Sequence, residues 1–197
     1  ADLRFEKERH RHIQNLGELL QAAGADAVHA FFVFLHLLKG NPQFFSHFLI
    51  KDIRLFYQLA GSPGDFDLFT QVYYKMDAAI SRDTINQLGQ QLKSGENPFD
   101  ALIRISGERA WQVKRLKELK AGFKKLKTAP PQKGIGMILD DLGYRSYLNF
   151  RISSGQSEEN IEQKLAVLKI LGGRVANFPD FFEKLERLAE KLQEPQT

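Results

Sequence analysis

The chain has 197 residues, 43% of them hydrophobic and 26% charged, so it can bury a core and has an ordinary globular composition. It contains no cysteine, which excludes disulfide bonds and thiolate metal sites and fits a reducing compartment such as the cytoplasm. The net charge of +4 favours weak attraction to polyanions, and the longest apolar run, residues 30–38, is far shorter than the ~20 residues of a membrane span.

The first 43 residues predict a pair of helices. Apolar residues repeat at three- and four-residue steps up to Gly24, and Asp26 can cap a second helix that reaches Leu38. Because Phe31, Phe32 and Phe34 cannot share one helix face, we expect this helix to be buried nearly all round. The alternative is that part of it meets a partner. The chain begins with Ala1, which fits either loss of an initiator Met or an excised fragment, and no signal peptide is expected.

Helical periodicity also dominates the rest of the chain, and period-2 alternation is nearly absent. Helices are predicted over residues 44–59, 65–79, 82–92, 99–105, 108–127, 135–142, 144–150, 158–171 and 179–192. Asp65 or Asp67, Ser81 and Ser157 are candidate N-caps. The predicted fold is an irregular all-α domain of about nine or ten helices without a significant sheet.

No motif predicts catalysis or a cofactor. A P-loop is missing, and Gly134 and Gly136 follow no strand, so they indicate a helix start rather than a nucleotide site. The histidines, all in the first quarter of the chain, lack a well-placed third ligand for a metal. They are His10, His12, His29, His36 and His47. We therefore predict no catalytic residue, no cofactor and no metal site.

Residues 104–127 carry the strongest charge signal. They hold nine Lys or Arg against two Glu, a local balance of 9 − 2 = +7, which leaves 4 − 7 = −3 for the rest of the chain. The apolar residues of this helix share one stripe, so its basic residues face solvent. The candidate DNA-binding residues are Arg109, Lys114, Arg115, Lys117, Lys120, Lys124, Lys125 and Lys127. A merely solvated basic face is the alternative.

Trp111 lies beside these basic residues. It could stack on a base, but we expect it to anchor the basic helix in the core instead.

Four stretches follow one another in order along residues 44–150. The first is Phe44-Phe45 with Ile50-Lys51-Asp52-Ile53, and the second is the turn Gly61-Ser62-Pro63-Gly64-Asp65. The third is Asp67 to Met76, which contains Tyr73-Tyr74-Lys75, and the fourth joins Pro130-Pro131 to Ile138-Leu139 and Gly143-Tyr144. Together they resemble the 2B helical insertion of UvrD/PcrA/Rep-type superfamily 1 DNA helicases, although Ala78-Ala79-Ile80-Ser81-Arg82 replaces the family's glycine-rich turn.

The resemblance implies a helicase 2B-like helical domain over residues 44–197 and leaves the pair at 1–43 unassigned. It implies a non-catalytic, regulatory module that contacts duplex or forked DNA weakly and without sequence preference. Its other partners would be the ATP-hydrolysing motor domains of the parent helicase, with no membrane involved. The alternative is a self-standing helical protein–protein adaptor whose basic helix engages an acidic partner.

Overall fold

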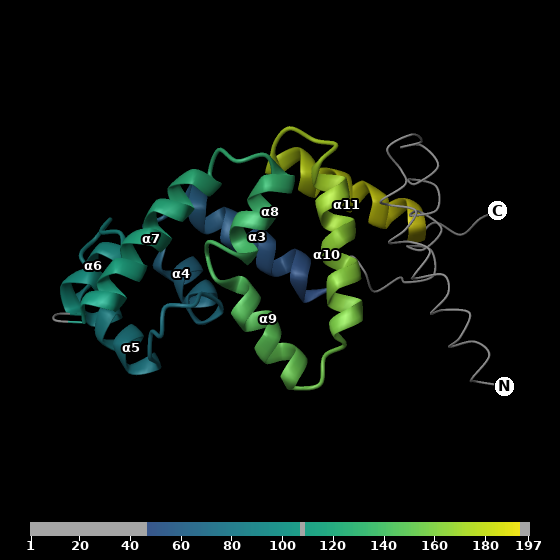
Figure 1. The fold of residues 1–197 in the computed structure, drawn as a ribbon. Coiled ribbons are helices and arrows are strands. Elements are labelled where there is room, and N and C mark those ends of the chain that lie inside the picture. Colours follow the sequence, from purple (N-terminus) through teal and green to yellow (C-terminus); the bar gives the residue numbers. More distant parts are fainter. Residues whose placement is uncertain (1–46, 107–108, 194–197) are drawn as a thin grey trace. The chain divides into compact units, whose positions relative to one another are not determined.

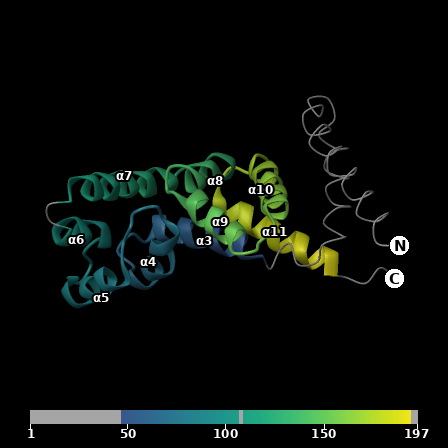
Figure 2. The same ribbon diagram turned by 60° about the horizontal axis from the view of Figure 1, so that its bottom comes forward.

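Helix α3 (Phe48–Gly61) is the central element of the computed structural model, which describes residues 47–106 and 109–193, with side chains through residue 190. It packs against α4 (Phe66–Val72), α7 (Ala110–Leu126) and α8 (Pro131–Leu139). Figures 1 and 2 show α3 in the middle, with α4 to α6 near one of its ends and α10 and α11 near the other.

The other elements are also helical, and no strand occurs in residues 47–106 or 109–193, which confirms the predicted all-α class. They are the 3₁₀ turn η1 (Tyr73–Lys75), α5 (Arg82–Gln91), α6 (Pro98–Ile105), α9 (Tyr144–Ser153), α10 (Glu158–Gly172) and α11 (Phe178–Gln193). Residues 45–191 form one compact unit. The predicted pair at 1–43, with Phe31, Phe32, Phe34 and four of the five histidines, lies outside the described residues.

Side-chain caps define most helix starts, because the first backbone N–H groups of a helix have no partner within it. Asp65 Oδ1 accepts from Leu68 N at 2.9 Å and Ser81 Oγ accepts from Thr84 N at 3.1 Å. Ser157 caps α10 in the same way, at 3.2 Å from Asn160 N. All three caps confirm the prediction from sequence.

Two predicted helices differ most from the observed ones. The helix expected over residues 65–79 ends at Val72 and continues only as η1, because the chain turns there to bury Lys75 and becomes extended at Met76. The helix expected from residue 135 begins at Pro131, where a missing N–H costs nothing. Gly134 lies inside this helix rather than at its start. The position requires glycine, because a Cβ there would lie 2.5 Å from the Phe178 ring.

A continuous row of aromatic rings joins five helices through the core. Tyr144 of α9 meets Phe56 of α3, which stacks on Phe123 of α7, with ring centroids 5.4 and 5.9 Å apart. The row continues through Phe99 of α6 to Phe69 of α4, at 5.5 and 5.2 Å. All five side chains are nearly fully buried, so this row accounts for four of the chain's 16 phenylalanines.

At the end of this row, three polar side chains from α3, η1 and α9 form a buried network. The Asp52 carboxylate accepts from Lys75 Nζ at 2.5 Å and from the Tyr144 hydroxyl at 2.7 Å. None of the three residues is more than 6% exposed. Burial, together with the adjacent Asp52 carboxylate, raises the pKa of Tyr144 far above its ordinary value, so the hydroxyl remains a donor. The buried polar groups of these three side chains thus provide one another with the hydrogen-bond partners that water would otherwise supply.

The turn after η1 is held by α7 in an unusual conformation. Ala79 has φ +48°, a left-handed value that an L-residue with a Cβ rarely adopts. The buried Gln112 side chain donates to the Ala78 and Ala79 carbonyls at 3.2 and 3.1 Å. Arg115 Nε donates to the Asp77 carbonyl at 2.8 Å. These three bonds from one helix hold the strained turn in place.

We predict that the network residues are strongly coupled. Asp52→Asn should lower the free energy of unfolding by about 3–5 kcal/mol, because the Lys75 ammonium would remain buried without a counter-charge. Tyr144→Phe should cost about 1.5–3 kcal/mol, the worth of a hydrogen bond to a charged group. The double variant Asp52→Leu with Lys75→Met should lose less free energy of unfolding than the sum of the losses in Asp52→Leu alone and Lys75→Met alone. Urea denaturation measures all of these, and small additive losses would contradict the network.

A second prediction concerns the strained turn. Ala79→Gly should raise the free energy of unfolding by up to about 1 kcal/mol, because glycine adopts positive φ without a steric cost. The matched control is Ala121→Gly, an exposed position inside α7, which should lower it by about 1 kcal/mol. Thermal denaturation of both variants shows whether each change raises or lowers the free energy of unfolding. An equal decrease in both variants would rule out a left-handed Ala79.

Candidate nucleic-acid interface

Helix α7 has an apolar face and a basic face. Leu116, Leu119, Phe123 and Leu126 are each at most 2% exposed, as their spacing predicts, and they hold the helix against the core. Val113, expected on the same stripe, is only partly buried, and Gln112 takes the inward position beside it. The opposite side of the helix is open to solvent along its length.

Four lysines share this open side. At about 100° per residue, Lys114, Lys117, Lys124 and Lys125 fall within an arc of about 100°, and they span about 16 Å of helix. All four are exposed, and no carboxylate among the described residues pairs with any of them. We call this set the lysine arc. The small residues Ala110 and Ala121 lie between these lysines and line a shallow hollow with Val113, Lys114, Lys117 and Glu118.

Two of the predicted DNA-binding residues are engaged in contacts within the protein. Lys120 Nζ lies 2.6 and 2.7 Å from the Asp100 carboxylate oxygens of α6. The Arg115 guanidinium binds the Asp77 carbonyl and lies 3.8 Å from Glu118, and its side chain is only 23% exposed. Both residues therefore hold α7 to its neighbours. Arg109 and Lys127 lie at the two ends of the helix and are exposed.

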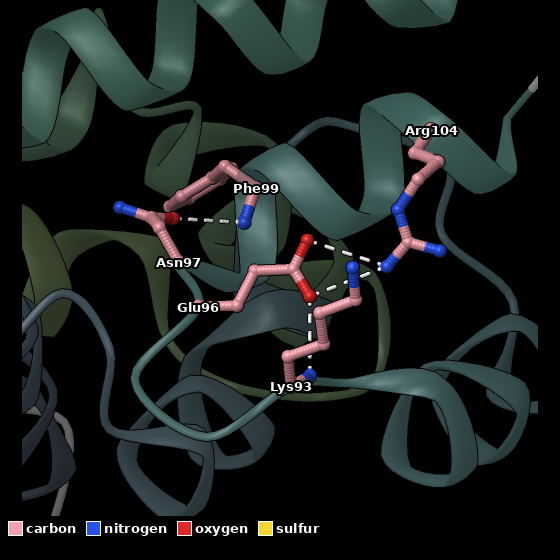
Figure 3. Close-up of polar contacts among 5 residues, drawn as sticks. All are labelled: Lys93, Glu96, Asn97, Phe99 and Arg104. Carbon is pink, nitrogen blue, oxygen red and sulfur yellow. Dashed lines mark hydrogen bonds and ion pairs between the residues drawn. The ribbon is translucent and has the colours of Figure 1, made fainter.

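Arg104, which belongs to the same basic segment, is also neutralised. Figure 3 shows its guanidinium against Glu96, with Nη2 at 3.2 and 3.3 Å from the two carboxylate oxygens. A backbone hydrogen bond from Lys93 N, at 3.1 Å, and the contact with Arg104 lower the pKa of Glu96. Asn97 in the same loop caps α6 through Phe99 N at 2.9 Å. Within the basic segment 104–127, the positive charge that has no ion-pair partner among the described residues therefore lies on α7 and at its two ends.

The helix dipole explains only half of the lysine arc. Lys124 and Lys125 lie in the last turn of α7, where positive charge is favoured by the carbonyl ends. Lys114 and Lys117 lie outside that turn. The first turn of α7 has no acidic residue, and Arg109 provides no side-chain cap. No ion pair among the described residues therefore compensates these two charges, and Glu118, which lines the same hollow, makes its ion pair with Arg115.

Our prediction that Trp111 anchors α7 in the core is wrong. The side chain is 59% exposed in the first turn of the helix. Position 111 lies about 60–140° around the helix from the four buried residues of the apolar stripe, at the edge of the open side. The helical periodicity of the sequence indicates this displacement.

No group of three or more His, Cys, Asp or Glu side chains is arranged to hold a metal in residues 47–106 and 109–193. His47 caps α3 instead, and burial together with Lys164 and Arg151 lowers its pKa to about 4. None of the described helices combines the length and hydrophobicity that crossing a bilayer requires.

No protein-family model, curated protein or solved structure matches this chain. The resemblance to the helicase 2B insertion therefore remains a prediction from the residues that carry it.

Arg115 and Lys114 are adjacent and carry the same charge, yet they should respond oppositely to removal of that charge. Arg115→Met should lower the free energy of unfolding by about 1–2 kcal/mol, because it removes the bond to the Asp77 carbonyl. Lys114→Met should change it by less than about 0.5 kcal/mol, since this exposed lysine makes no hydrogen bond or ion pair with the described residues. Chemical denaturation compares the pair, and equal values would mean that Arg115 does not hold the turn.

Proposed function

We propose that this chain is a non-catalytic accessory domain that binds DNA weakly and without sequence preference through the lysine arc of α7. The observation that carries the proposal is four exposed lysines on one helix face with no carboxylate partner in the described protein. Lysines spaced along a rod suit a phosphate backbone that carries one charge per ~1.7 Å of duplex. Because the apolar face of α7 is held in the core, the folded helix presents these side chains to solvent on one side.

The core network supports placing this domain in a UvrD-like helicase. Asp52, Lys75 and Tyr144 come from three of the separate stretches that resemble the 2B insertion, and the fold brings them into hydrogen-bond contact. Three chance matches would not be expected to converge in this way. The Ala78–Arg82 segment, which replaces the family's glycine-rich turn, also contains the left-handed Ala79. On this proposal the domain acts in the cytoplasm, next to the motor domains that hydrolyse ATP.

A protein–protein adaptor is the second candidate, and a different observation favours it. Tyr74 and Phe150 are 52% and 64% exposed, and a binding surface would require that such side chains join in one contiguous apolar patch. An adaptor would use these rings together with the lysine arc to hold an apolar or acidic partner. The two candidates differ in whether nucleic acid binds at all, so one experiment separates them.

The test is reversal of the whole arc, Lys114→Glu, Lys117→Glu, Lys124→Glu and Lys125→Glu, with duplex DNA binding measured by fluorescence anisotropy at low salt. The matched control reverses four exposed basic residues elsewhere: Lys51, Arg82, Lys93 and Lys133. Both sets change the net charge by the same amount, from +4 to 4 − 8 = −4. Any difference between them therefore reports the position of the charge rather than its sum.

The arc variant should bind at least about tenfold more weakly than the control, because it loses the phosphate contacts themselves. Its helical circular dichroism should be unchanged, since exposed charges contribute little to stability. If the two variants bind DNA equally, the arc is only a solvated face and the adaptor candidate takes precedence.

A further inference from the structure

The indole of Trp111 is a large apolar surface that the fold does not use. It is 59% exposed, and no ring–ring or cation–π contact with it occurs among the described residues. The other two large rings that are exposed in the described part of the chain, Tyr74 and Phe150, differ in their surroundings. Tyr74 meets Tyr73 and Tyr147 edge-on, and no unpaired lysine lies within four residues of Tyr74 or Phe150 along the chain.

Trp111 lies next to the lysine arc. Residues three and four apart are neighbours on a helix surface, so Lys114 and Arg115 flank the indole. Arg115 is held by the Asp77 carbonyl, whereas Lys114 is free. Glu118 is the one acid on this side of α7. Its carboxylate lies 3.8 Å from the Arg115 guanidinium, and that positive charge offsets the negative charge of Glu118. An aromatic face thus lies about one helix turn from an uncompensated positive charge.

We propose that Trp111 stacks on an unpaired base while the lysine arc holds the adjoining phosphates. This inference rests on the proposed function and narrows it to DNA that exposes single-stranded nucleotides. A groove that combines positive charge with an aromatic face is the usual means of binding single strands without sequence preference. A base pair inside a duplex presents its edges and hides its faces, so a duplex exposes a face only at its two ends. A single strand, a tail or a fork offers the faces of its unpaired bases along its length.

Trp111 is the single tryptophan of the chain, so its fluorescence reports this contact directly. The titration uses the full chain at low salt with three probes: oligo(dT) of about 12 nucleotides, a blunt duplex, and the same duplex with an unpaired tail. Oligo(dT) and the tailed duplex should quench the emission, and the blunt duplex should quench it much less. Polyglutamate, added to a separate sample, tests whether negative charge alone changes the emission.

Substitution of Trp111 tests the same contact by affinity, measured with labelled DNA. Trp111→Ala should weaken oligo(dT) binding about tenfold, within the range for loss of one stacked base, and change blunt-duplex binding little. Trp111→Phe should retain part of the preference because its ring can still stack. Thermal stability should be unchanged in both variants, since the side chain is not part of the core.

Each alternative result has one meaning. If wild type binds all three DNAs alike without selective quenching, and Trp111→Ala binds as wild type does, the stacking proposal is wrong and the lysine arc alone binds DNA. Quenching by polyglutamate as strong as that by oligo(dT) would equally overturn it. If no DNA binds at low salt, the proposed function fails as well.

Discussion

The fold depends on the burial of an ionic network at the centre of the described unit. Asp52, Lys75 and Tyr144 have few alternatives once water is excluded, because an unpaired charge there would cost several kcal/mol. Satisfying Asp52 fixes where η1 ends and how α9 lies against α3. The row of aromatic rings from Tyr144 to Phe69 then extends that arrangement through α3, α7 and α6 to α4. Tyr144 therefore belongs to both systems: its hydroxyl donates to Asp52, and its ring packs against Phe56.

The same constraint positions the candidate interface. Because η1 ends with Lys75 buried, the chain must turn sharply at residues 77–79, and that turn is gripped by Gln112 and Arg115 of α7. These bonds, with the apolar stripe of α7, set the rotation of the helix about its own axis. The lysine arc faces outward as a result of that rotation. Basic residues of one segment thereby divide into those that hold the fold and those that stay free.

The sequence predicted what depends on local pattern and missed what depends on distant partners. Helical class, most helix ranges and the caps at Asp65, Ser81 and Ser157 follow from residues close together in the chain. The pairing of Lys120 with Asp100, and of Arg115 with the Asp77 carbonyl, joins residues 20 and 38 positions apart, so no local pattern indicates it. The helix predicted to reach residue 79 ends early for the same reason, since Lys75 is buried against Asp52, a partner 23 positions away in the chain. The exposure of Trp111, by contrast, could have been predicted from its position around the helix.

The central claim is that α7 offers a small set of free charges to a phosphate backbone, and salt dependence measures that number directly. Binding of a blunt duplex should fall linearly on a plot of log affinity against log salt, with a slope of about −0.9 per phosphate neutralised. Contacts from two to four lysines of the arc give a slope of roughly −2 to −4. Binding with a slope near zero, or no binding at low ionic strength, would contradict the account.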